Sequence, residues 1–123
     1  MKKSMDLMKK LITIIVISAC VVLFAGCSGK EGRKVKYMEQ GISKFEEGDF
    51  EKARVNFRNV LQIDPKDAKG RYWLGRTLEK REEWRQAAGY FNAALEIDPN
   101  YRDAMVRVAR IMLMARDDKA ALE

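Results

Sequence analysis

Residues 51–100 read EKARVNFRNVLQIDPKDAKGRYWLGRTLEKREEWRQAAGYFNAALEIDPN, and within this stretch residues 53–65 recur in similar form at 87–99. Three pairs of matching residues lie 34 positions apart: Ala53 and Ala87, Phe57 and Phe91, Pro65 and Pro99. A fixed period of this length is typical of stacked helix–turn–helix units rather than of enzyme folds. No strand pattern occurs elsewhere in the chain. The stretch therefore predicts an all-α protein built as a solenoid of helix pairs.

The composition argues against several classes of site. The 123 residues include no histidine and only two cysteines, so histidine-based metal sites and general bases are excluded. No carboxylate pair has a spacing typical of catalysis, and we expect no enzyme activity, no metal and no cofactor. The formal net charge is +6, but residues 1–26 hold four lysines and one aspartate, which leaves 20 basic against 17 acidic side chains. A remainder of +3 gives little support for a nucleic-acid partner.

The N-terminal segment has the order of a secretory signal peptide. Residues 1–10 contain four lysines, and residues 11–25 form the apolar run LITIIVISACVVLFA. The next residues complete the sequence Phe24-Ala25-Gly26-Cys27, which resembles a bacterial lipobox. In a lipobox, small residues precede a cysteine that is lipidated and becomes the N-terminus after cleavage. The resemblance implies lipidation of Cys27. Because Ser28 stands where an aspartate would retain a lipoprotein, it also implies the periplasmic face of an outer membrane.

Alternatives remain open for this segment. A rival lipobox ends at Cys20, so either cysteine is a candidate for processing. The segment is also compatible with an uncleaved membrane anchor, although the apolar run is short for a spanning helix, which needs about 20 residues. An inner-membrane anchor that leaves the chain in the periplasm is the alternative location. Residues 27–36 contain two glycines and five charges, and they predict a flexible tether before the domain at 37–123.

From Tyr37 onward, apolar residues recur at helical spacing. A first helix is expected to end at Gly48, since glycine readily adopts the left-handed conformation, and Asp49 is expected to cap the next helix. A residue that precedes proline is driven out of helical geometry, so helices should also end at the two Asp-Pro pairs. A turn is expected at 116–118, with a short sixth helix after it. The other expected helices are about 50–63, 68–80, 84–97 and 102–115.

These positions resemble the tetratricopeptide repeat (TPR), whose signature places small, aromatic and proline residues over 34 positions. The resemblance implies repeats at about 34–67 and 68–101, followed by an incomplete repeat at 102–123. It departs from the signature at Gln40, Lys44 and Arg71. The residues that it implies pack the repeats together are Gly41, Ala53, Phe57, Pro65, Leu74, Gly75, Ala87, Phe91, Ala94 and Pro99.

The resemblance also implies a peptide-binding groove, because the first helices of successive TPR pairs line a concave face. Basic and aromatic residues at the corresponding positions imply an acidic or carboxylate-bearing peptide, although charged side chains on such a face are often only solvated. A chaperone-tail clamp is not expected, since only Arg107 matches a basic clamp position. The groove residues implied in this way are Tyr72, Arg76, Lys80, Arg107 and Arg110.

A lipobox followed by TPR units resembles lipoproteins that assemble bacterial secretion, pilus or exopolysaccharide systems. We therefore expect a membrane-tethered scaffold for protein–protein interaction in the cell envelope. The apolar residues of segment 102–115 have little to cover them, which predicts either self-association through this C-terminal end or a fragment of a larger TPR protein. A nucleic-acid-binding helical repeat is a third, less favoured reading.

Overall fold

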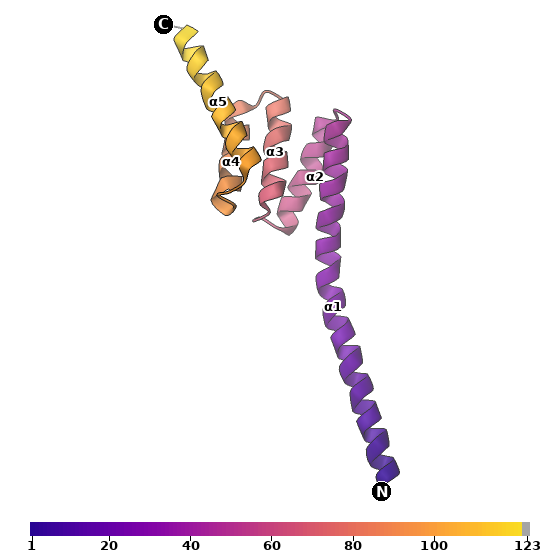
Figure 1. Ribbon diagram of the computed structural model, residues 1–123. Coiled ribbons are helices and arrows are strands. Elements are labelled where there is room, and N and C mark those ends of the chain that lie inside the picture. The colour runs from indigo at the N-terminus through magenta and orange to yellow at the C-terminus, as the bar shows by residue number, and fades with distance from the viewer. Residues whose placement is uncertain (122–123) are drawn as a thin grey trace. The chain divides into compact units, whose positions relative to one another are not determined.

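The computed structural model of the chain describes residues 1–121, with the side chains of all of these except 19–28 and 120–121. The described residues form five helices and no strand (Figure 1). The all-α prediction is confirmed, and the predicted ranges 50–63, 68–80 and 84–97 agree with the observed helices. The helices are α1 (Lys2–Glu46), α2 (Phe50–Ile63), α3 (Ala68–Lys80), α4 (Trp84–Ile97) and α5 (Arg102–Ala121).

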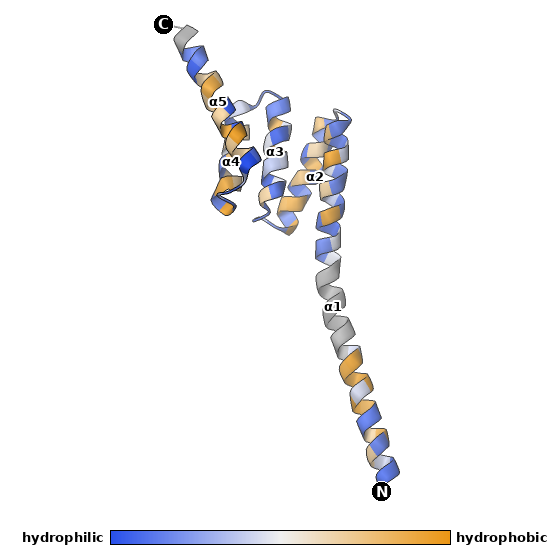
Figure 2. Ribbon diagram, viewed as in Figure 1, coloured by the Kyte–Doolittle hydropathy of each residue, from blue (hydrophilic) through white to orange (hydrophobic). Residues whose placement is uncertain are grey.

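The chain divides into two compact units, residues 1–33 and residues 34–123, and the division falls within α1. In the first unit, the side chains of residues 2–18 and 29–33 are exposed. Figure 2 shows hydrophobic residues along the N-terminal part of α1. Within the described part of the chain, no helix combines the length and the apolar character needed to cross a bilayer. The side chains of Cys20 and Cys27 lie outside the described residues, so lipidation remains a prediction.

Residues 27–36, for which the sequence predicted a flexible tether, are helical and belong to α1. Adding a residue to an existing helix costs much less than nucleating a new one, and the lysines, arginine and glutamate of this segment are good helix formers. Its two glycines each cost about 1 kcal/mol. The end of the segment is also held by packing contacts: Lys34 Nζ lies 3.0 Å from an Asp64 carboxylate oxygen and 3.4 Å from one of Asp67.

The helix ends follow the predicted local chemistry. Gly48 adopts a φ of +82°, and the Asp49 carboxylate accepts a hydrogen bond of 3.1 Å from the Lys52 backbone N–H at the start of α2. Asp67 caps α3 in the same way, accepting a 2.6 Å hydrogen bond from the Gly70 N–H. Asp64, which precedes Pro65, is extended with a φ of −135° and a ψ of 92°, as proline requires of its predecessor.

The residues that recur after 34 positions in the sequence also form the hydrophobic core. Ala53 and Phe57 of α2 and their partners Ala87 and Phe91 of α4 are all fully buried. Each phenylalanine ring packs against a glycine of the preceding helix. A Cβ added to Gly41 would lie 2.5 Å from a ring carbon of Phe57, and one added to Gly75 would lie 2.7 Å from a ring carbon of Phe91. Real Cβ atoms essentially never approach so closely. The helices of each pair therefore cross closely only because these two positions have no side chain.

The predicted turn at 116–118 is wrong, because α5 continues as one helix to Ala121. The turn inside each of the two earlier helix pairs contains a residue with positive φ: Gly48 at 82° and Glu82 at 63°. Residues 115–119 read Ala-Arg-Asp-Asp-Lys, with neither glycine nor proline to end a helix. Among the described residues, the third repeat is therefore a single long helix rather than a helix pair.

Candidate functional site

A buried carboxylate lies on the face formed by the first helix of each pair. Glu79 of α3 is 8% exposed, and two arginines surround its carboxylate. Arg76 Nε, one turn earlier, lies 3.2 Å from Glu79 Oε2. Arg107 of α5 donates from Nη1 to both carboxylate oxygens at 3.3 Å. A buried charge is costly unless it is paired, so this network fixes both guanidinium groups and joins α3 to α5.

The same Arg76 guanidinium lies over three aromatic rings. Its Cζ is 5.4 Å from the ring centre of Phe45 in α1, 5.9 Å from that of Tyr72 and 6.0 Å from that of Trp73. A cation over an aromatic face gains about 0.5–2 kcal/mol, more where water is excluded. Arg76 Nη1 also donates a 3.1 Å hydrogen bond to the Tyr72 hydroxyl. We call this group the arginine–aromatic cluster: Phe45, Tyr72, Trp73, Arg76, Glu79 and Arg107.

Further ring contacts hold the cluster in place. Trp73 packs edge-on to Phe45 at 5.3 Å and stacks on Phe57 at 5.9 Å. Tyr101, in the turn before α5, packs against Tyr72 at 5.0 Å. Burial raises the pKa of Tyr101 to about 12, with a smaller contribution from Tyr72, so its hydroxyl stays protonated at neutral pH. These contacts hold in place the aromatic rings against which the Arg76 guanidinium lies.

The cluster has an excess of positive charge that is partly open to solvent. The side chains of Arg76 and Arg107 are 18% and 22% exposed, whereas Arg76 Nε itself is buried against the Glu79 carboxylate. Two arginines face one glutamate, so the network retains one net positive charge. An anionic group that reaches this face would gain charge-assisted hydrogen bonds without first having to order the arginines.

The tetratricopeptide repeat family model matches residues 38–102. The chain belongs to the tetratricopeptide repeat family. TPR units form protein–protein interaction scaffolds and are typically not catalytic, so the prediction of an interaction scaffold is confirmed at this level.

Solved TPR structures share the fold. The TPR2B domain of yeast Sti1 in complex with pHsp70 is 24% identical, with a TM-score of 0.66 over 73% of this chain and 72% of that chain. The TPR domain of Arabidopsis OM64 is 24% identical, with a TM-score of 0.62 over 63% and 64% of the two chains. The C-terminal TPR-containing domain of a Plasmodium falciparum FK506-binding protein is 19% identical, with a TM-score of 0.66 over 74% and 60%. At these identities, the likeness shows the fold alone.

The predicted groove residues of this TPR chain fall into two groups. Arg76 and Arg107 meet in the arginine–aromatic cluster. Tyr72 is there too, but its ring is only 6% exposed, which leaves it little surface for a ligand. Lys80 and Arg110 are exposed and lie outside the cluster.

Sequence reasoning missed Glu79, although one signal was present in the sequence. Glu79 follows Arg76 by three positions, so the two side chains share a face of α3. What the sequence did not show is that Arg107, which is 28 positions away, lies close to the same carboxylate.

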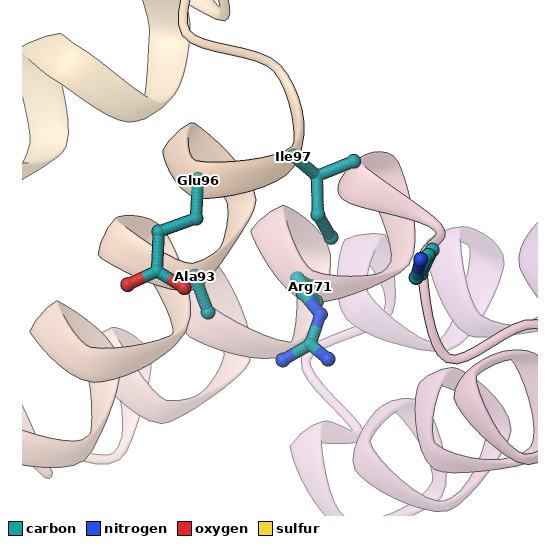
Figure 3. A pocket seen from close by; sticks show the side chains of 5 residues that line it. Arg71, Ala93, Glu96 and Ile97 are labelled. Carbon is teal, nitrogen blue, oxygen red and sulfur yellow. The ribbon is translucent and has the colours of Figure 1, made fainter.

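Arginine also lines two open depressions on the surface of this TPR domain. One of about 420 Å³ lies between α3 and α4, with Arg71, Ala93, Glu96 and Ile97 at its wall (Figure 3). Another of about 350 Å³ shares Arg71 and Ala93 with it. The Arg71 guanidinium already donates from Nε and Nη2 to the Pro65 carbonyl oxygen at 3.1 and 2.8 Å. The Arg71 side chain thus already binds the backbone of the turn after α2. We therefore assign these depressions no binding role.

Proposed function

We propose that this TPR protein is a membrane-tethered scaffold of a bacterial cell envelope that binds an acidic, extended peptide of a partner protein on its arginine–aromatic cluster. The observation that supports this most strongly is the position of Arg76. Its guanidinium lies over aromatic rings from two helices and pairs with Glu79, and its side chain remains 18% exposed.

The cluster favours a carboxylate over a neutral group for two reasons. First, the net charge of Arg76, Glu79 and Arg107 is positive, and hydrogen bonds to charged acceptors are about twice as strong as neutral ones. Second, the aromatic rings of the cluster and Glu79 already hold the arginine side chains in place. Binding of a ligand therefore does not carry the entropy cost of ordering these long side chains. Glu79 offsets one of the two positive charges, so we expect moderate affinity, with a dissociation constant in the micromolar range or weaker.

Peptide binding also agrees with the fold likeness. The structure of the Sti1 TPR2B domain is that of a complex with pHsp70, so a domain of this fold holds a protein-derived partner. The likeness does not identify the partner of the present chain. In this chain the cluster has one glutamate between two arginines, and the proposal therefore specifies an acidic segment and no particular protein.

The site proposal is tested with matched peptides. The full chain, in a non-ionic detergent, is titrated into two fluorescently labelled extended peptides, one rich in Asp and Glu and the other with Asn and Gln at the same positions. The acidic peptide should bind, and Arg76→Gln should weaken its binding by about fivefold or more, as expected for loss of a charge-assisted contact. Arg58→Gln, at an exposed position on α2, is the matched control and should leave affinity unchanged. Equal binding of both peptides, or equal loss in both variants, would sink the proposal.

The tether rests on the sequence of residues 1–27, with its four lysines, apolar run and lipobox-like end. We place the lipid on Cys27 and the domain in the periplasm at the outer membrane, with an inner-membrane anchor as the alternative. Assembly of a secretion, pilus or exopolysaccharide system is the setting we propose for it. Metabolic labelling with a palmitate analogue should be lost in Cys27→Ser and kept in the matched Cys20→Ser. The reverse pattern would move the lipid to Cys20, and labelling of both variants would exclude a single lipidated cysteine.

A further inference from the structure

One stripe of α5 is exposed although its counterparts in the earlier repeats are covered. Positions 38, 72 and 106 are equivalent in the 34-residue period. Met38 is 9% exposed and Tyr72 is 6% exposed, whereas Val106 is 61% exposed. At positions 45, 79 and 113, too, the side chain is at least partly covered in the first two repeats and exposed in the third. Phe45 packs against Trp73 of the next repeat at 5.3 Å, whereas Leu113 is 53% exposed. Among the described residues, this stripe of α5 is therefore left uncovered.

The exposed face is large and mostly apolar. Elsewhere on the exposed side of α5, Met105, Met112 and Met114 are 44%, 64% and 42% exposed. The end of α5 projects past the loop between α3 and α4 (Figure 1), and hydrophobic residues continue along the helix (Figure 2). A helix end that projects alone gains little stability, and exposed apolar side chains gathered on one side of a helix often mark an interaction site.

The charges on the stripe identify an occupant. Arg110 and Asp117 lie seven positions apart, which is two helical turns, on either side of Leu113. Both side chains are exposed. The described contact of Asp117 is a long one, 3.9 Å to its neighbour Arg116, and both of these side chains are more than 75% exposed. Asp117 can therefore take another partner at little cost.

We propose that the stripe formed by Val106, Arg110, Leu113 and Asp117 pairs with the same stripe of a second copy, the two α5 helices running antiparallel about a two-fold axis. An axis between Leu113 and Met114 places position 110 of one helix opposite position 117 of the other. Arg110 then meets Asp117 twice, once on each side, and the two Leu113 side chains meet near the centre. A two-fold interface must be self-complementary in this way.

The apolar side chains supply the stability of this pair, and the charges set its direction. Exposed ion pairs contribute little individually. In a parallel arrangement, however, Arg110 would face Arg110 and Asp117 would face Asp117, and like charges in contact disfavour that alternative.

Sedimentation equilibrium of the full chain in a density-matched non-ionic detergent tests the pairing. The wild-type chain should show a reversible monomer–dimer equilibrium. Arg110→Asp and Asp117→Arg should each weaken the dimer by about tenfold, because each puts two like-charged pairs across the axis. The double variant, which exchanges the charges, should return to within about threefold of wild type. Leu113→Asp should abolish the dimer, and Arg58→Asp on α2 is the control.

The other outcomes contradict the proposal. A wild-type chain that stays monomeric would contradict the pairing and would favour a helix of another protein as the binding partner of the stripe. Association that persists unchanged in Leu113→Asp would run through another surface, such as the apolar residues 11–25. Single charge reversals that weaken the dimer without rescue by the double exchange would exclude the antiparallel register. All of these substitutions are at exposed positions, so circular dichroism should show wild-type helicity for each variant.

Discussion

The close crossing of α3 and α4 at Gly75 gives a sharp test of the fold, through the substitution Gly75→Ala. A new methyl group there would lie 2.7, 2.9 and 3.2 Å from three ring carbons of Phe91. The Phe91 ring is fully buried, so it cannot swing out into solvent. Overpacking of this kind typically costs about 1–3 kcal/mol.

Gly89 provides the matched control. It lies on α4, is exposed, and a Cβ added there would have no neighbour within 4 Å. Alanine within a helix is favoured over glycine by about 1 kcal/mol, and this gain applies equally at positions 75 and 89. The difference between the two alanine variants therefore isolates the steric cost at the crossing. Gly89→Ala should be stabilised by up to about 1 kcal/mol, and Gly75→Ala should be about 1–3 kcal/mol less stable than Gly89→Ala.

Thermal unfolding followed by circular dichroism measures this difference on the full chain. For a domain of this size, about 1 kcal/mol corresponds to roughly 4–8 °C in the unfolding midpoint. The two alanine variants should therefore differ by about 4 °C or more, with Gly75→Ala the lower. Equal midpoints would refute the reasoning, because they would mean that α3 and α4 do not cross closely at Gly75.

Three further predictions follow from single contacts. Asp49→Ala should destabilise the chain by about 1 kcal/mol in urea unfolding, because the Lys52 N–H at the start of α2 loses its acceptor, and an unchanged midpoint would count against this cap. Glu79→Gln should destabilise by about 1–3 kcal/mol, and its effect should be less than additive with Arg107→Gln in a double-mutant cycle; strict additivity would show that the two side chains do not interact. Because burial raises the pKa of Tyr101 to about 12 while the unfolded value is near 10, stability should fall as the pH rises from about 10 to 12, and Tyr101→Phe should reduce that loss; a tyrosinate titration without a late component would contradict the burial.

Local chemistry explains why the helix bounds could be predicted from the sequence. Gly48, with its positive φ, and Asp49, with its capping carboxylate, act within a few residues of where they stand. The Asp-Pro pairs act equally locally. Where the sequence contains no such residue, the prediction was wrong: segment 116–118 has no glycine or proline, and α5 continues through it. In the 27–36 segment the glycines suggested flexibility, whereas the structure has helix there, with Lys34 held by its ion pair with Asp64.

The candidate site could be predicted only in part, because its geometry depends on contacts between distant positions. The repeat placed Arg76 and Arg107 on one face, and the structure places them on one carboxylate. It could not show that Tyr101 would cover Tyr72, which leaves that ring buried against its neighbours. Nor could it show that Glu79 neutralises part of the basic face. Both facts follow from side-chain contacts that Tyr101 and Arg107 make with α3, and the 34-residue period alone does not contain them.

The most direct measurement of peptide binding at the cluster is the NMR signal of the arginine Nε–H groups in the full chain, with the Arg76 resonance assigned by its loss in Arg76→Lys. An acidic extended peptide should shift this resonance in a saturable way, because a carboxylate bound at the exposed part of the Arg76 guanidinium changes the surroundings of the Nε–H beside Glu79. The Asn and Gln counterpart of the peptide should not shift it, and the Arg58 resonance should stay in place with both. An Arg76 resonance that does not move while the acidic peptide binds would contradict the assignment of the site.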